Sequence, residues 1–332
     1  MESNSNLFNT TVSAPGKIHL LGEHVVVYGK PALIAAINRR LYTNVKINPP
    51  AGGQKSKIKN GKISIKTNSD TRLVKQAIIV FKNAFKIKDL PGLEITINSQ
   101  IPVGSGLGSS AAIAVSVIGV LMKAVLNIWN PTKINELAFE VEKLQHRNPS
   151  GGDNTVVTFG GLIWYRREFD FLKSIWSLPI INYKIPPFVL IDSGKPQEST
   201  GQMVDSVRKI GINNQAYFEK ILTSQEKETK SLLLALKGGD NKAIKQSIVN
   251  GERNLEKLKV IGIKAKKIIS EIEKIGGAAK VSGGGGKKKG SGYLLCYHED
   301  LARLTILEKK LGLRMEKIKL GEEGVRIEQC QK

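Results

Sequence analysis

Apolar positions along the chain recur with two different periods, and each period predicts one type of secondary structure. Helical spacing predicts helices over residues 74–85, 111–126, 134–145, 200–210, 215–236, 241–255, 263–275 and 301–311. Alternation, or a short apolar run bounded by turn residues, predicts strands over residues 25–28, 41–47, 93–97, 188–191 and 293–297, with a further strand near the end. Residues 155–165 predict a strand–turn–strand pair.

The chain has 332 residues, a length that favours two domains. Pro186 and Pro187 interrupt the pattern directly before the strand predicted at 188–191. We therefore place the boundary between about residues 165 and 187, which gives domains of residues 1–175 and 176–332. Residues 50–66 are rich in lysine and glycine and end in an alternating run, so they predict an exposed hairpin.

The composition is that of an ordinary globular protein, with 41% hydrophobic and 24% charged residues, which excludes a disordered or fibrous chain. The 51 basic and 29 acidic residues give a net charge of +22. This charge predicts an anionic partner, and nucleic acid, acidic lipid and a polyphosphate nucleotide all fit it. Aromatic residues are only 6%, which argues weakly against a surface that stacks single-stranded bases.

Cysteine and histidine positions argue against a zinc site or a disulfide scaffold. Neither Cys296 nor Cys330 has metal-site spacing, and the four histidines form no pairwise motif. The first ten residues are polar and lack the layout of a signal peptide. The longest uncharged apolar run, residues 111–121, is shorter than a membrane span requires. We therefore expect a cytoplasmic protein that does not enter a membrane.

The strongest local motif is the glycine-rich segment 102–110, which runs directly into the helix predicted at 111–126. Glycines allow several backbone N–H groups to point one way, and the helix adds the positive end of its dipole, so the segment can hold a phosphate. Ser109 and Ser110 could cap this helix or reach a magnesium ion. The alternative is a flexible turn. The Walker-type phosphate-loop pattern is absent from the chain, and the spacing of the glycines does not fit the dinucleotide-binding motif, so both classes are disfavoured.

Two further segments place charged side chains among turn residues. Lys17, Glu23 and His24 lie within residues 13–31 and could surround a polar substrate, or they could be ordinary loop charges. Glu142 lies late on a predicted helix and Asp153 follows a turn. This pair could supply a metal ligand and a general base, or a solvated helix charge and a turn cap.

A second glycine cluster occupies residues 280–292 and contains three consecutive lysines. Its glycines favour close approach of the backbone to a ligand, and its lysines would add positive charge for a phosphate. A surface loop is the alternative for this segment.

Together these segments resemble the three motifs of the GHMP small-molecule kinases, in the family's order and over residues 14–292. The resemblance implies an α+β fold of two domains, the first ribosomal S5 domain 2-like and the second ferredoxin-like. It also implies phosphorylation of a small-molecule hydroxyl by ATP with Mg²⁺, and a homodimer. Within the family the sequence is most similar to members whose acceptor is mevalonate. The alternatives are a phosphomevalonate or homoserine kinase and, from another class, a basic nucleic-acid-binding protein, which the lysines spread over both halves disfavour.

The resemblance also implies a role for individual residues. Asp153 would accept the proton of the acceptor hydroxyl, and Lys17 would pair with Asp153 and the reacting oxygens. Ser110 and Glu142 would bind magnesium. The acceptor would be held by Lys17, Glu23, His24, Asp153, Ser199 and Thr200. ATP would be bound by Gly104, Ser105, Gly106, Leu107, Gly108, Ser109, Ser110, Ser282, Gly283 and Gly284.

The third motif departs from the family's usual pattern. Gly284 stands where the family usually has alanine, and Lys287, Lys288 and Lys289 interrupt the glycine run. The loop is therefore expected to be about two residues longer than usual. Its lysines could supplement phosphate binding, but the interpretation we favour is that they are solvated.

Overall fold

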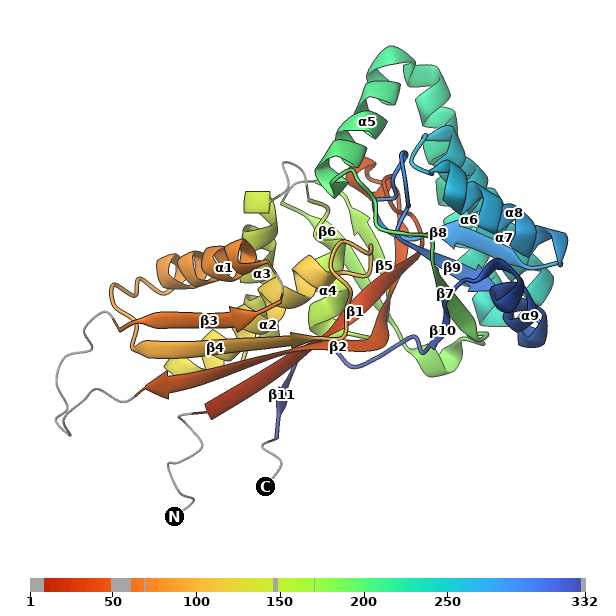
Figure 1. Ribbon diagram of the computed structural model, residues 1–332. Coiled ribbons are helices and arrows are strands. Elements are labelled where there is room, and N and C mark those ends of the chain that lie inside the picture. The colour runs from red at the N-terminus through yellow and green to blue at the C-terminus, as the bar shows by residue number, and fades with distance from the viewer. Residues whose placement is uncertain (1–8, 49–60, 69, 146–148, 170, 330–332) are drawn as a thin grey trace, which may run out of the picture.

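The computed structural model describes residues 9–48, 61–68, 70–145, 149–169 and 171–329. Within these ranges the strands form two sheets, of seven and four strands, with helices packed against both (Figure 1). This mixture of helices with mainly antiparallel sheets confirms the expected α+β fold.

The first sheet is built around two long strands, β1 (Asn9–Leu21) and β2 (Ala32–Asn48), which pair antiparallel. The first residues of β2 pair with β5 (Leu162–Arg167), and its later residues pair with β4 (Gly92–Ser99). β3 (Ile63–Thr67) lies parallel to β4, and β6 (Lys173–Leu178) pairs with β5. Register shifts interrupt the pairing of β1 at Pro15/Gly16 and His19/Leu21, so the strand bends where it carries its charged residues.

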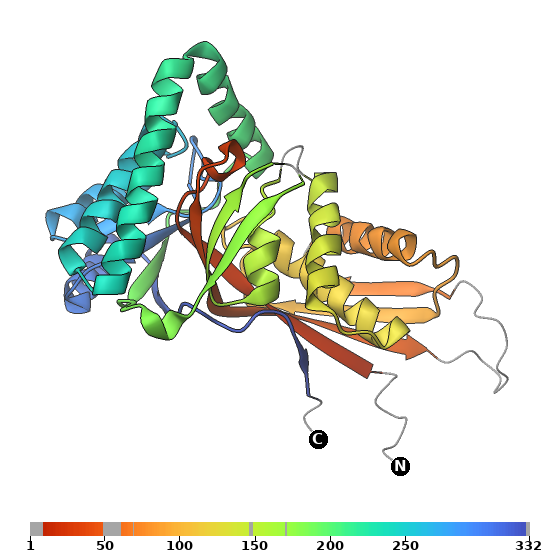
Figure 2. The ribbon, with the colours of Figure 1, turned by 180° about the vertical axis from the view of Figure 1, so that it is seen from behind.

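One face of the first sheet is covered by α1 (Thr71–Ala84), α2 (Ser109–Leu126), α3 (Pro131–Gln145) and α4 (Gly152–Phe159), which lie in front of the strands in Figure 2. α2 is apolar around its whole circumference because it packs against β1, β2 and neighbouring helices. By length and hydropathy alone α2 could span a membrane, which the sequence argument did not predict, but 78% of that stretch is buried inside the protein.

The second sheet contains β7 (Phe188–Asp192), β8 (Ala278–Val281), β9 (Tyr293–Tyr297) and β10 (Met315–Ile318), in the antiparallel order β10-β7-β9-β8. Its helices are α5 (Thr200–Asn213), α6 (Gln215–Gly238), α7 (Asn241–Lys257), α8 (Ile263–Lys274) and α9 (Leu301–Leu311). α7 and α8 both pack on β8. The bounds of these five helices agree with the predicted bounds to within a few residues. The prediction succeeds because the amphipathic spacing is regular and because capping residues such as Ser199 and Asp240 mark helix starts.

The chain crosses between the two sheets more than once. The expected boundary at residues 175/176 falls inside β6, and η3 (Ile180–Asn182) leads from there to β7. Near the C-terminus, β11 (Arg326–Glu328) returns to the first sheet and pairs with β1. The two sheets are therefore joined by several segments.

Two local predictions were wrong. Residues 155–159 belong to α4 and not to a strand: Thr155 Oγ1 donates to the Gly151 carbonyl at 2.6 Å, and Val156 and Val157 are buried in the core. Here tertiary packing overrides the strand preference of β-branched residues.

Residues 25–28 were predicted as a strand, but the structure has a single 3₁₀ turn, η2 (Val26–Tyr28), in the connection between β1 and β2. In the expected hairpin of residues 50–66, residues 49–60 lie outside the described ranges. The part that is described, β3, pairs in parallel with β4, and the hairpin stays a prediction.

Candidate functional site

The three sequence motifs meet between the two sheets, where the loop before α2 contacts both β1 and the glycine loop after β8 (Figure 1). The backbone N–H of Lys17 in β1 donates to the Leu107 carbonyl at 2.9 Å. The Tyr293 N–H donates to the Ser105 carbonyl at 3.3 Å. The segment before α2 is thus fixed on one side by the first sheet and on the other by the second.

The glycines of this loop are required by how closely its neighbours approach. Gly106 has φ +82°, and a Cβ atom there would lie 2.4 Å from the Ser282 carbonyl oxygen. Gly108 also has φ +82°, and its Cβ atom would lie 2.6 Å from Cγ of Lys17. The structure thus brings the predicted ATP-binding residues of the second and third motifs together and places Lys17 directly beside them.

Helix α2 begins directly after this loop. Gly108 is the N-cap, Ser109 is buried, and Ser110 is exposed in the first turn. Ser109 Oγ has no hydrogen-bond partner among the described residues. An α-helix N-terminus preceded by glycines offers free N–H groups and a positive dipole to an anion.

β1 presents two side chains to Asp153, which lies in the first turn of α4. Lys17 Nζ is 2.9 Å from Oδ2 of Asp153, and His19 Nε2 is 2.9 Å from Oδ1. Lys17 and His19 are buried, whereas the Asp153 side chain is 34% exposed to solvent. Lysine and aspartate were predicted to pair, and the structure brings them together.

The electrostatics keep Asp153 ionised. Burial by itself raises the pKa of Asp153, but the charge of Lys17 and the hydrogen bond from His19 outweigh it and hold the pKa well below its usual range. The N-terminal position of Asp153 on α4 acts in the same direction. Asp153 is therefore a carboxylate at neutral pH, able to accept a hydrogen bond from a hydroxyl group.

Glu142 on α3 shows the opposite shift. Its burial and the nearby charge of Asp153 raise the pKa of Glu142 to about 8, although Lys17 and Lys173 oppose this. A divalent cation would favour the ionised form of such a buried carboxylate. The described residues contain no cluster of three or more His, Cys, Asp or Glu side chains suited to a metal. A cation held by Glu142 and a serine hydroxyl would therefore complete its oxygen ligands with phosphates and water, as Mg²⁺ commonly does.

Glu23 and His24 lie in the turn after β1 and have partners from the third motif. Glu23 is buried and forms an ion pair with the fully buried Lys280. Burial lowers the pKa of His24 to about 4, so its neutral ring donates from Nε2 to the Gly284 carbonyl at 3.2 Å. Their contact with the acceptor stays a prediction.

The chain as a whole is similar to known kinases. Residues 72–161 match the GHMP kinases N terminal domain, and residues 4–47 match a galactokinase galactose-binding signature. The mevalonate kinase of Thermococcus sibiricus is 31% identical, over 95% of this chain and 97% of that relative. The chain belongs to the mevalonate kinase family.

Solved structures of GHMP kinases support the family assignment at the level of the fold. The L. major mevalonate kinase in complex with R-mevalonate has a TM-score of 0.76 at 22% identity and covers 94% of this chain and 96% of that one. The Streptococcus pneumoniae phosphomevalonate kinase has a TM-score of 0.75 at 19% identity, covering 94% and 99%. Because these values are so similar, the fold alone does not distinguish the acceptors. Membership in the mevalonate kinase family nevertheless favours an enzyme over the nucleic-acid-binding alternative.

Three residues near the mevalonate kinase motifs were missed by the sequence argument. His19 contacts Asp153, and Lys173 from β6 lies near Glu142. The Lys195 side chain lies against the glycine-rich loop before α2, since a Cβ atom at Gly104 would be 3.3 Å from Lys195 Cε. His19 was one of four histidines that form no pairwise motif, and the two lysines were two among many. Spacing along the sequence gave no signal for any of them.

The loop after β7 and the third motif also meet. Ser199 is the N-cap of α5, with its hydroxyl accepting from the Gln202 N–H at 3.2 Å. Thr200 lies against Gly284, since a Cβ atom there would be 3.2 Å from the Thr200 hydroxyl. Lys287, Lys288 and Lys289 are exposed, and Lys287 Nζ donates to the Ser206 hydroxyl of α5. Their exposure agrees with the solvated interpretation.

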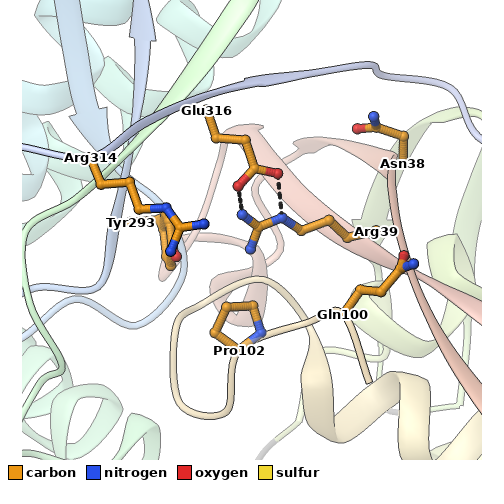
Figure 3. A pocket seen from close by; sticks show the side chains of 7 residues that line it. All are labelled: Asn38, Arg39, Gln100, Pro102, Tyr293, Arg314 and Glu316. Atoms are coloured by element: carbon orange, nitrogen blue, oxygen red, sulfur yellow. Dashed lines mark hydrogen bonds and ion pairs between the residues drawn. The ribbon is translucent and has the colours of Figure 1, made fainter. Parts of the chain in front are cut away.

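A separate pocket of about 400 Å³ lies beyond the start of the phosphate loop and contains none of the predicted catalytic residues (Figure 3). Arg39 of β2 donates from Nε to Glu316 of β10 at 2.8 Å, and its guanidinium lies 5.5 Å from the Tyr293 ring centre. This ion pair links the two sheets. The pocket is lined by Asn38, Arg39, Gln100, Pro102, Tyr293, Arg314 and Glu316.

Proposed function

We propose that the protein transfers the γ-phosphoryl group of ATP to the 5-hydroxyl group of mevalonate. The full-length similarity to the T. sibiricus mevalonate kinase supports the acceptor. The observation that carries the chemistry is the Lys17–Asp153 pair at 2.9 Å, placed directly beside the glycine loop. Phosphoryl transfer depends mainly on positioning and charge stabilisation, and this arrangement supplies both.

Asp153 acts on the acceptor hydroxyl. Its carboxylate accepts a hydrogen bond from this hydroxyl, and it takes the proton as the new oxygen–phosphorus bond forms and the bond to the ADP oxygen breaks. Because Lys17 and His19 hold the pKa of Asp153 low, the carboxylate is a weak base. The proton therefore moves late, when the attacking oxygen has already lost electron density to phosphorus.

Lys17 and the glycine loop act on the transferring group. The N–H groups of residues 104–110 and the α2 N-terminus hold the phosphates, and Lys17 stabilises the charge on the γ-phosphoryl oxygens. Its side chain passes over Gly108, so one ammonium group can contact both this group and Asp153.

We propose that Glu142 and Ser110 hold Mg²⁺ with the ATP phosphates. Glu142 is buried beside Asp153, and its raised pKa fits a carboxylate that a cation keeps ionised. When bound, Mg²⁺ would neutralise phosphate charge and help to orient the transferring group.

The test is ADP release from Mg-ATP with mevalonate, 5-phosphomevalonate, homoserine, galactose or no acceptor. We expect release with mevalonate only. Release with another of these acceptors would retain the phosphoryl-transfer chemistry and replace the substrate. Absence of release with every acceptor, from folded protein that binds ATP, would contradict the proposed function.

The homodimer implied by the family resemblance and the cytoplasmic location expected from the sequence stay predictions. Sedimentation or light scattering of the purified protein would check the homodimer, and fractionation of cells would check the cytoplasmic location. The contacts of Glu23, His24, Ser199 and Thr200 with the acceptor are also proposals, which KM values for mevalonate in single variants would check.

A further inference from the structure

The Asp153 carboxylate is held by a donor on each of its two oxygens, and both donors come from β1. Lys17 Nζ is 2.9 Å from Oδ2, and His19 Nε2 is 2.9 Å from Oδ1. Side chains two residues apart on a strand project to the same face, so β1 delivers both groups to one carboxylate. The chemistry proposed above uses Lys17 and Asp153 but gives no role to His19.

His19 occupies a position at which an apolar side chain would be expected. It is only 5% exposed, and its neighbours Ile18, Leu20 and Leu21 are fully buried. Its other ring nitrogen, Nδ1, is buried and has no hydrogen-bond partner among the described residues. Burying a polar nitrogen without a partner costs stability. Packing alone therefore does not account for a histidine here, whereas its bond to Asp153 does.

The ring nitrogen facing Asp153 must carry the proton, because an ionised carboxylate only accepts hydrogen bonds. The position of the ring is fixed from the backbone side as well. The fully buried Lys280 of β8 donates from Nζ to the His19 carbonyl oxygen at 3.2 Å. The second sheet thus holds β1 at the residue whose side chain contacts Asp153.

The carboxylate plane of an aspartate rotates at little energetic cost, because the torsion between its sp³ and sp² carbons has no sharp staggered minima. A single hydrogen bond to Oδ2 would leave the carboxylate plane free to rotate. A second donor on Oδ1 fixes this plane, and with it the direction of the remaining lone pairs. The acceptor hydroxyl needs one of these lone pairs in a constant place.

We propose that His19 is a positioning residue for phosphoryl transfer, which fixes the plane of the Asp153 carboxylate by donating from Nε2 to Oδ1. This inference rests on the proposed function, because its readout is turnover with mevalonate. His19 touches neither ATP nor the acceptor in this proposal. Its removal should therefore lower kcat and leave the KM values unchanged.

The test compares His19→Leu, which removes the donor, with His19→Gln, whose amide N–H can reach the position of Nε2. His19→Leu should lower kcat about 10- to 100-fold, the range expected for one hydrogen bond to a charged group. KM for ATP and for mevalonate should change less than about threefold. His19→Gln should recover most of the lost kcat. Circular dichroism and thermal unfolding establish that each variant is folded.

A kcat for folded His19→Leu close to that of the wild type would overturn the proposal. So would a rise in KM at constant kcat, which would make His19 a substrate-binding residue, or a His19→Gln variant as impaired as His19→Leu. If His19→Leu does not fold, His19→Gln is compared with His19→Asn, whose side chain is too short to reach Asp153. A kcat that is retained in His19→Gln and lowered in His19→Asn supports the proposal. Equal kcat values in these two variants contradict it. A wild-type protein that does not phosphorylate mevalonate is recognised separately, and would overturn the proposed function together with this inference.

Discussion

Two lysine–carboxylate ion pairs lie close to β1, and they differ in their access to solvent. In the Lys17–Asp153 pair the side chains are 4% and 34% exposed, whereas in the Lys280–Glu23 pair they are 0% and 3% exposed. The first pair joins β1 to α4 and faces the glycine loop. The second joins the turn after β1 to β8. The same chemical pair is therefore partly open to solvent at the candidate site, and is buried where it connects the two sheets.

The difference extends to how fully each lysine is satisfied. Lys280 donates to Glu23, to the His19 carbonyl at 3.2 Å and to the Val281 carbonyl at 2.7 Å, which uses all three of its protons. Among the described residues, the one partner identified for the Lys17 ammonium group is the Asp153 carboxylate. Its ammonium group therefore keeps donor capacity for a phosphate. A buried charge that is fully paired holds structure together, and one with spare donors can bind a ligand.

The largest expected effect is on turnover, at the exposed pair. Asp153→Asn should lower kcat about 10³-fold, because general-base catalysis contributes 10²- to 10⁴-fold, and Lys17→Met should also lose most turnover. Both folds should survive. Coupled ADP release measures kcat, and Asp240→Asn at the α7 N-cap is a matched control. Near-normal turnover in either variant would remove that residue from the mechanism.

Substitutions in the buried Lys280–Glu23 pair should lower the stability of the protein. Lys280→Met leaves the Glu23 carboxylate buried without its partner, which should lower the free energy of unfolding by about 3–5 kcal/mol. The double variant Lys280→Met/Glu23→Leu should lose less, because no unpaired charge remains. Urea denaturation at neutral pH measures both. A double variant less stable than the single one would contradict this account of the pair.

A smaller effect is expected where the second and third motifs touch. Gly106→Ala places a Cβ atom 2.4 Å from the Ser282 carbonyl oxygen at φ +82°, so it should lower the free energy of unfolding by about 1–3 kcal/mol and weaken ATP binding. Gly312→Ala is the control, since Gly312 has φ +60° but nothing within 4 Å. Titration calorimetry with ATP checks the binding. Equal ATP affinity in the two variants would show that the contact with Ser282 does not shape the loop.

An effect of a single titrating group is expected on the pH dependence of stability. Burial, with the charge of Asp153, raises the pKa of Glu142 to about 8 in the folded protein, so the folded state keeps this proton to higher pH than the unfolded chain. The free energy of unfolding should therefore fall as pH rises from about 4.5 to about 8. Glu142→Gln should make this slope shallower. Burial also raises the pKa of Glu252 to about 8, so part of the slope should persist. Denaturation midpoints across this range measure it, and an unchanged slope would contradict the assignment.

The sequence predicted the helices well because their periodicity is local. α1, α2 and α5–α9 follow from apolar spacing and from capping residues within the same segment. Residues 155–159 show the limit: their β-branched side chains favour a strand, but the buried contacts of Val156 and Val157 stabilise α4. The parallel pairing of β3 with β4 is also a non-local contact that alternation cannot predict.

Some residues of the candidate site could likewise be predicted from the sequence, and others could not. Lys17, Glu142, Asp153 and the glycine loops were identified from motifs and family resemblance, and the structure brings Lys17, Asp153 and the loops together. His19 was not identified, because one histidine in a strand gives no local signal. Its partner Asp153 lies 134 residues away.

The amino-acid sequence by itself determined most of the helical segments, the glycine-rich loops and the family, because each depends on residues close together in the chain or on their order. Only the tertiary structure decided which ion pair is partly open to solvent and which is buried. Lys280 and Glu23 are 257 residues apart, and each looks like an ordinary charge in its own segment. Burial and pairing follow from how the two sheets pack, and this packing sums contacts over the whole chain.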